Sequence, residues 1–149
     1  MEDDRGAGFF IYKKTRPSGI IVVQKPGLAD MPGRVIVWAV IRAEKVTTEE
    51  KKPGGWRYVG TELESELKLL NGIVGKEYKV LESNVFHFVN GANVRNRTKR
   101  LLLIPVNGTP KSISGEPLLD DSYYCTEAGQ LLFGERWDII LAALAEKET

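Results

Sequence analysis

The chain has 149 residues, of which 42% are hydrophobic and 28% charged, a composition typical of one globular domain with a single core. Its 21 basic and 20 acidic side chains leave a net charge of +1, which argues against bulk attraction to nucleic acid or anionic membranes. One cysteine and one histidine exclude an intramolecular disulfide and a zinc site built from Cys and His ligands.

We therefore expect a single domain over residues 1–149. The acidic start, residues 1–5 (MEDDR), is not followed by an apolar run, so it does not resemble a signal peptide. No apolar stretch reaches the length of a transmembrane helix. These features predict an intracellular protein that does not associate with membranes.

The first third of the chain is expected to form strands, because β-branched and aromatic residues gather there. The strands are placed at residues 8–13, 19–25 and 34–45. The alanines near the end of the third segment leave a helix open as an alternative. The charged segment 47–55, which ends in Pro-Gly-Gly, predicts a solvated loop.

The best-defined element is a helix predicted over residues 61–71. Thr61 and Glu64 have the spacing of a capping box, and Asn71-Gly72 supplies a stop signal. Apolar residues recur at helical spacing and predict the face that packs on the core: Leu63, Leu67 and Leu70.

The second half of the chain predicts three more strands and two more helices. The strands are placed at residues 77–82, 85–89 and 100–106, a turn-rich loop at 107–121, and the helices at 126–132 and 135–147. His87 alternates with aromatic residues and is expected on the open face of its strand, whereas Cys125 is expected in the core. The order of elements predicts an α+β domain with helices on both sides of a mixed sheet.

Several segments stand in the order and at about the spacing found in one enzyme family. They are residues 6–14 (GAGFFIYKK), 20–24 (IIVVQ), 53–55 (PGG) and 126–132 (TEAGQLL). Together they resemble the Nudix superfamily, in particular the diadenosine tetraphosphate hydrolase branch. The resemblance implies a Nudix-like α/β/α sandwich with a mixed sheet. It also implies a helix whose glutamates gather magnesium for the attack of water on a phosphoanhydride.

The helix at 61–71 departs from that family's catalytic helix at the carboxylates. When it is aligned on the glycine near its end, Glu66 matches one family glutamate, but Leu69 and Leu70 replace two others. A second alignment, shifted by four residues, uses Glu62 and Glu66 and loses the glycine. Magnesium prefers several hard oxygen ligands. We therefore interpret the helix as degenerate, with Glu62 and Glu66 as catalytic and metal-binding residues only if the chain is active.

Other residues are candidates for ligand contacts. The basic cluster 95–100 contains Arg97, Lys99 and Arg100, which suit phosphate groups, although a solvated hairpin tip is an equally simple interpretation. Aromatic residues near loops, namely Trp56, Tyr123 and Tyr124, are candidates for stacking on a base, with loop packing as the alternative. Glu116 is a weak candidate for a metal ligand.

The hypothesis drawn from the sequence is a diverged Nudix-like domain that binds a nucleotide, a dinucleoside polyphosphate or an RNA 5′ end without efficient hydrolysis. One alternative is a magnesium-dependent hydrolase of a nucleoside-diphosphate-linked substrate, in which Glu49, Glu50 or Glu116 supplements Glu62 and Glu66. Another is a protein-interaction subunit of a complex. No cofactor is expected unless the chain is active, in which case it is magnesium.

Overall fold

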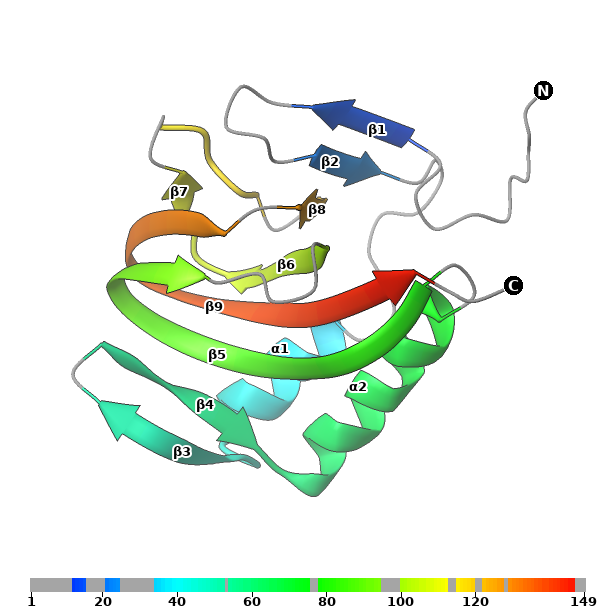
Figure 1. Cartoon of the computed structure of the whole chain (residues 1–149). Helices are drawn as coiled ribbons and strands as arrows, with labels where there is room; N and C mark the ends of the chain where they lie inside the picture. The colour runs from blue at the N-terminus through cyan, green and yellow to red at the C-terminus, as the bar shows by residue number, and fades with distance from the viewer. Residues whose placement is uncertain are drawn as a thin grey trace.

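Two strands of 17 residues each, β5 (Tyr78–Val94) and β9 (Gln130–Glu146), form the centre of the fold and pair along their whole length (Figure 1). This computed structural model describes residues 12–15, 21–24, 34–52, 54–75, 78–94, 100–112, 115–119, 122–127 and 129–146. None of the helices in these ranges is long and apolar enough to cross a membrane.

The remaining strands extend this pair into a nine-stranded sheet with the order β1-β2-β8-β6-β9-β5-β4-β3, and β7 pairs with β9 beside that path. The other elements are β1 (Tyr12–Thr15), β2 (Ile21–Gln24), α1 (Arg34–Arg42), β3 (Thr47–Lys52), β4 (Gly55–Val59), α2 (Thr61–Val74), β6 (Leu101–Asn107), β7 (Lys111–Ser112) and β8 (Tyr123–Thr126). Every pairing between the described strands is antiparallel.

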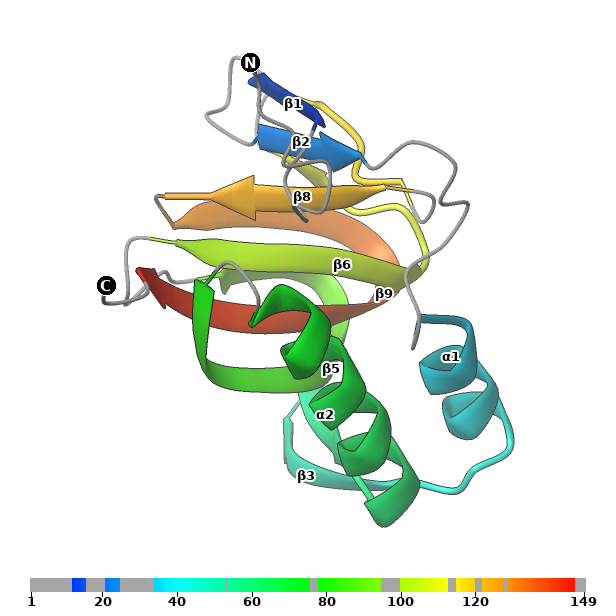
Figure 2. The ribbon, with the colours of Figure 1, turned by 90° about the vertical axis from the view of Figure 1, so that its right-hand side faces the viewer.

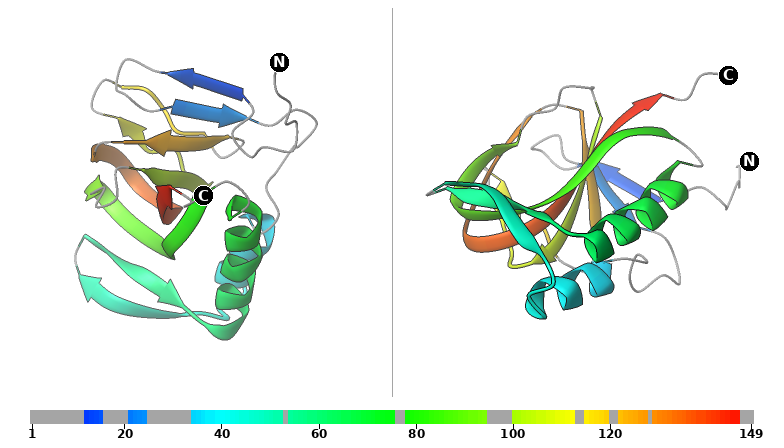
Figure 3. Two further views of the ribbon diagram at one scale, coloured as in Figure 1. Left: turned by 45° about the vertical axis from the view of Figure 1, so that its right-hand side comes forward. Right: turned by 90° about the horizontal axis from the view of Figure 1, so that it is seen from below.

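The long strands bend sharply near one end (Figure 3). At the bend the register shifts between Val89 and Asn90, and Asn90 has a positive φ of 73°. Gly91 follows, where an added Cβ would come within 3.1 Å of the Phe133 ring. A bulge with a left-handed residue bends a strand and strengthens its twist, so the sheet has a concave and a convex face here.

The two faces of the sheet carry separate cores. On one face, α1 and α2 lie side by side over the strands (Figure 2). Val37 of α1 and four residues of α2 pack there against the sheet in one apolar cluster with residues such as Val85, Leu102 and Ile140. The opposite face carries a second cluster, which includes Leu103, Leu132, Trp137 and Ile139.

The prediction of an α+β domain is confirmed, but two elements exchange type. Residues 34–42, predicted as a strand, form helix α1, in which Val37 and Val40 face inward at helical spacing. Of residues 135–147, predicted as a helix, 135–146 belong to β9, and residue 147 lies outside the described residues. Residues 137–140 are all buried because β9 has a strand on each side and apolar packing on both faces. Burial on both faces outweighs the helix propensity of this alanine-rich segment.

The predicted loop at 47–55 is also wrong, since residues 47–52 form β3 and residue 55 begins β4. The predicted strands 77–82 and 85–89 fall in one strand, β5, apart from residue 77, which lies outside the described residues. The predicted helix 126–132 is wrong as well, because Thr126 ends β8 and Gln130 begins β9. The loop at 107–121 contains the short β7, and the strand at 100–106 matches β6. The described parts of the predicted strands 8–13 and 19–25 lie in β1 and β2, and the rest of both lies outside the described residues.

The helix predicted at 61–71 is confirmed, with its three leucines buried, but its ends differ. Gly60 is the N-cap and no side chain caps the helix, so the proposed capping box does not form. The helix runs to Val74 and ends at Gly75. In the described part of the chain both helices cover the same face of an antiparallel sheet, in place of the expected mixed sheet between two helical layers.

Candidate ligand-binding hollow

A hollow of about 480 Å³ lies on the face of the sheet opposite to the helices. Its lining residues come from both long strands and β6: Leu81, Glu82, Asn84, Phe86, Phe88, Asn93, Val94, Leu101, Leu141 and Ala143. A second space of about 350 Å³ adjoins it and shares Phe86, Phe88 and Asn93 with it. We call the two together the hollow. The bend in β5 creates it, because residues 91–94 are turned back toward residues 86–88.

Two phenylalanines form the floor of the hollow. Phe86 and Phe88 alternate along β5, so both project from the same face of the sheet. Their rings are stacked, with centroids 5.6 Å apart and an angle of 20° between the planes, and Phe88 also packs on Trp137 at 4.8 Å. Both rings are only half-buried. Half-buried aromatic rings inside a concave surface suit a planar apolar ligand.

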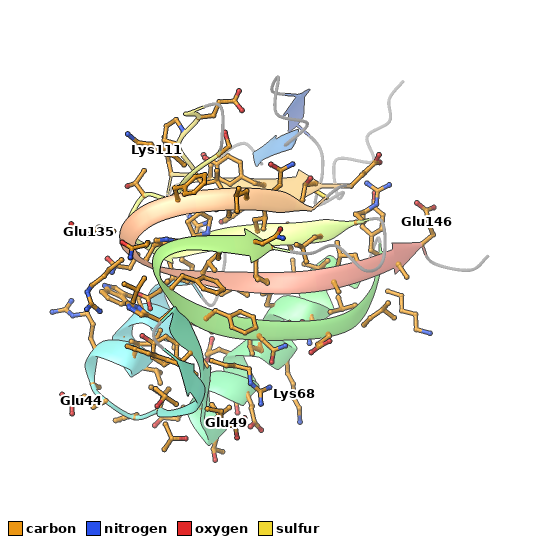
Figure 4. All side chains as sticks on the ribbon, turned by 60° about the vertical axis from the view of Figure 1, so that its left-hand side comes forward. Glu44, Glu49, Lys68, Lys111, Glu135 and Glu146 are labelled. Carbon is orange, nitrogen blue, oxygen red and sulfur yellow. The ribbon has the colours of Figure 1, made fainter. Side chains whose placement is uncertain are left out.

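Polar side chains form one wall beside this floor. Arg57 of β4 lies opposite Phe86 in the register, and its Nη1 donates a hydrogen bond to Asn84 Oδ1 at 3.1 Å. Its Nη2 also forms an ion pair with Glu49 of β3, which Figure 4 labels near the β3–β4 edge. Asn84 Nδ2 in turn donates to Glu82 Oε2 at 3.0 Å. The wall is therefore a chain of hydrogen bonds that joins three strands.

A buried polar cluster lies on the other face of the same strands. Asp138 is 2% exposed, and its Oδ1 accepts a hydrogen bond from Tyr58 at 2.8 Å and lies 2.9 Å from Nδ1 of His87. Asn107 Nδ2 donates to Asp138 Oδ2 at 3.3 Å. Arg136 lies 3.4 Å from Nε2 of His87. Because arginine only donates, Nε2 of His87 is the acceptor in this contact, and Nδ1 faces the Asp138 carboxyl group.

The polar groups of this cluster are paired with one another, so the cluster has the features of a structural network and not of a reactive site. Trp56 stacks on His87 with ring centroids 4.3 Å apart, and His87 is buried, not on the open face that the sequence predicted. Burial and the hydrogen bond to Asp138 raise the pKa of Tyr58 well above its ordinary value, so its hydroxyl stays a donor. Both oxygens of the buried carboxylate have donors, which is the condition for burying such a charge at tolerable cost.

The Pro-Gly-Gly segment has a structural role in the described residues. At Gly55 φ is +146°, and an added Cβ would lie 2.1 Å from the backbone oxygen of His87. This position therefore requires glycine, because it brings β4 into contact with β5 as the turn closes. Gly54 and Gly55 also line the hollow beside Trp56.

The expected catalytic residues do not form a metal site in the described part of the chain. Glu62 is exposed and lies 3.7 Å from Lys45. One carboxylate oxygen of Glu66 is buried without a hydrogen-bond partner. Glu116 contacts Ser112 of β7, far from α2 in Figure 1. No three His, Cys, Asp or Glu side chains gather within the described ranges.

The expected ligand-contacting residues are also dispersed. Arg97 and Lys99 lie outside the described residues. Arg100 pairs with Glu127 and Glu146, at 3.6 and 3.4 Å, and lies over the Tyr78 ring. Figure 4 shows Glu146 well apart from Glu49.

The two tyrosines expected to stack on a base belong to the cores. Tyr123 is 4% exposed and Arg34 lies over its ring, while Tyr124 is fully buried and its hydroxyl accepts a hydrogen bond from the backbone of Leu119. Of the three aromatic candidates, only Trp56 borders the hollow, and its ring stacks on His87 on the opposite face of the sheet. Cys125 is buried, as predicted.

Sequence reasoning missed Phe86, Phe88, Arg57 and Asn84 as site residues. The alternation in Val85-Phe86-His87-Phe88-Val89 was visible, but it does not tell which face of the strand is concave. The bend at Asn90 determines that, and a single asparagine is a weak signal.

Comparisons of the chain with protein-family models, with curated proteins and with solved structures gave no match.

Proposed function

We propose that this chain binds a small planar ligand of the nucleoside or nucleotide class in the hollow, without hydrolysing it by a magnesium mechanism. The observation that supports binding is the half-buried, stacked pair Phe86 and Phe88 inside a concave surface. Ring stacking on exposed aromatic side chains is a common way to hold a base. The amide groups of Asn84 and Asn93 add hydrogen-bonding partners for a polar ring edge.

The proposal does not depend on a Nudix relationship. In that family the helix carrying the glutamates faces the substrate, whereas α2 lies on the face opposite to the hollow. Leu70 is in the core and Leu69 is exposed, so neither offers an oxygen ligand to a metal. A ligand in the hollow would therefore be separated by the sheet from Glu62 and Glu66.

The proposal is tested by calorimetric titration of the full chain with adenosine and with ATP. In the Phe86→Leu variant we expect the affinity for the ligand that binds to fall about tenfold, since stacking on an aromatic ring contributes about 1–3 kcal/mol per base. Phe133→Leu is the matched control, because Phe133 is exposed and does not line the hollow. It should leave the affinity unchanged.

Absence of binding by both compounds at millimolar concentration would remove the proposal, as would equal losses in the two variants. Phosphate release from ATP with magnesium tests the rival hydrolase. We expect no turnover, and turnover that disappears in Glu66→Gln would establish the rival instead.

A further inference from the structure

We infer that the hollow selects a planar heterocycle carrying an amine donor, and that it discriminates against phosphate-bearing forms of the same ring. This inference rests on the proposed function and specifies the charge of the ligand. It follows from the pairing of Arg57 with Glu49 and from the contacts of Glu82 among the described residues.

Among the described residues that line the hollow, the one cation, Arg57, is already paired. The guanidinium of Arg57 donates from Nη2 to Glu49 and from Nη1 to Asn84. An incoming phosphate would have to displace the Glu49 carboxylate from this contact. Because the phosphate and the Glu49 carboxylate carry the same sign of charge, the exchange contributes little net binding free energy.

The acidic residue in the lining, Glu82, has no ion pair with a described residue. Among the described residues, its carboxylate accepts one side-chain hydrogen bond, from the neutral amide of Asn84. Lys79 precedes Glu82 on β5 and does not line the hollow. With Glu49, Arg57 and Glu82 counted together, the wall carries a net charge of −1. These three described residues therefore favour a hydrogen-bond donor or a cation over an anion.

The geometry suits a ligand of nucleoside size. Glu82 precedes Phe86 by four residues, which is about 13 Å along an extended strand. Its carboxylate reaches back toward Phe86, because it accepts the hydrogen bond from Asn84. A ring stacked on Phe86 can thus direct an exocyclic amine to Glu82, with the Asn84 side chain beside it.

The test compares the affinities of adenosine, inosine and ATP for three forms of the full chain: the natural protein, Glu82→Gln and Glu64→Gln. Inosine replaces the amine of adenosine by a carbonyl oxygen. Glu64→Gln makes the same change in charge on exposed α2, on the opposite face of the sheet. Melting temperatures confirm that each variant is folded.

We expect the natural protein to bind adenosine at least about fivefold more tightly than either inosine or ATP at low ionic strength. Glu82→Gln should weaken the binding of adenosine and strengthen the binding of ATP. The ratio of the affinity for adenosine to that for ATP should therefore fall about threefold or more. Glu64→Gln should leave the ratio unchanged.

Binding of ATP as tight as that of adenosine would overturn the inference while leaving the proposed function intact. So would an affinity ratio that Glu82→Gln does not change. If neither adenosine nor ATP binds, the inference and the proposed function are both refuted.

Discussion

Asp138 of β9 is a buried carboxyl group that joins β4, β5 and β6 through its side-chain contacts. It accepts hydrogen bonds from Tyr58 and Asn107 and contacts His87, each of which comes from a different strand. A buried carboxylate that loses a donor carries an uncompensated desolvation cost. Each of these partners is therefore expected to contribute to stability rather than to catalysis.

Removing the Tyr58 hydroxyl tests this role. We expect Tyr58→Phe to lower the free energy of unfolding by about 1–3 kcal/mol at pH 7, because Asp138 loses a hydrogen bond to a charged acceptor. The measurement is urea denaturation followed by tryptophan fluorescence. No loss of stability would contradict the role assigned to the cluster.

The same residue predicts a dependence on alkaline pH. The pKa of Tyr58 is raised above its ordinary value of 10.0 in the folded chain, so the folded state holds this proton more tightly than the unfolded state. Stability from this source is complete below pH 10 and is lost as pH rises above that value. Urea denaturation between pH 9 and pH 11 should show a shallower decline for Tyr58→Phe than for the natural protein.

At the scale of elements, glycines have opposite effects in the β3–β4 hairpin and in α2. Gly55 has a positive φ and touches the β5 backbone, whereas Gly72 lies within α2 with no atom within 4 Å of an added Cβ. In the hairpin, glycine is needed for the fold. In the helix it only adds conformational freedom to the unfolded chain.

A pair of alanine variants should separate these effects. Gly55→Ala is expected to destabilise the protein by more than about 2 kcal/mol through the clash with the His87 backbone. Gly72→Ala should stabilise it by about 0.5–1 kcal/mol, since alanine favours the helix. Thermal unfolding of the two variants beside the natural protein measures both changes, and a shift of the same sign in both would refute the assignment.

At the scale of the whole molecule, the β5–β9 pair holds the two cores together. β9 lies between β5 and β6, and each of its faces belongs to a different apolar cluster. β3, by contrast, stands at one end of the sheet order, so among the described strands it has a partner on one side only. Local opening should therefore be least frequent in the centre of the sheet.

Amide hydrogen exchange followed by mass spectrometry tests this gradient. Peptides covering residues 83–88 and 137–142 should exchange slowest, and those covering β3 fastest, because unpaired edge groups open without breaking the core. Ligand bound in the hollow should slow exchange further in residues 84–94. Uniform exchange across the sheet would contradict this description.

The helix α2 and the strand β6 were predictable from sequence because their own periodicity and apolar content decide their state locally. Two other segments were not. Arg34–Arg42 is β-branched yet helical, and the alanine-rich end of β9 is extended. In both, the neighbours that the segment packs against override its own propensity.

By itself, the sequence determined the α+β class, the main helix with its buried leucines, the buried cysteine and the shortage of carboxylates on α2. Only the tertiary structure decided where a ligand would bind. The hollow depends on a bend at Asn90 that turns the end of β5 toward Phe86 and Phe88. It also depends on strands distant in sequence bringing Arg57 and Glu82 beside the same rings. Neither the curvature of a strand nor its pairing partners can be seen in a local stretch of residues, because both are set by contacts across the sheet.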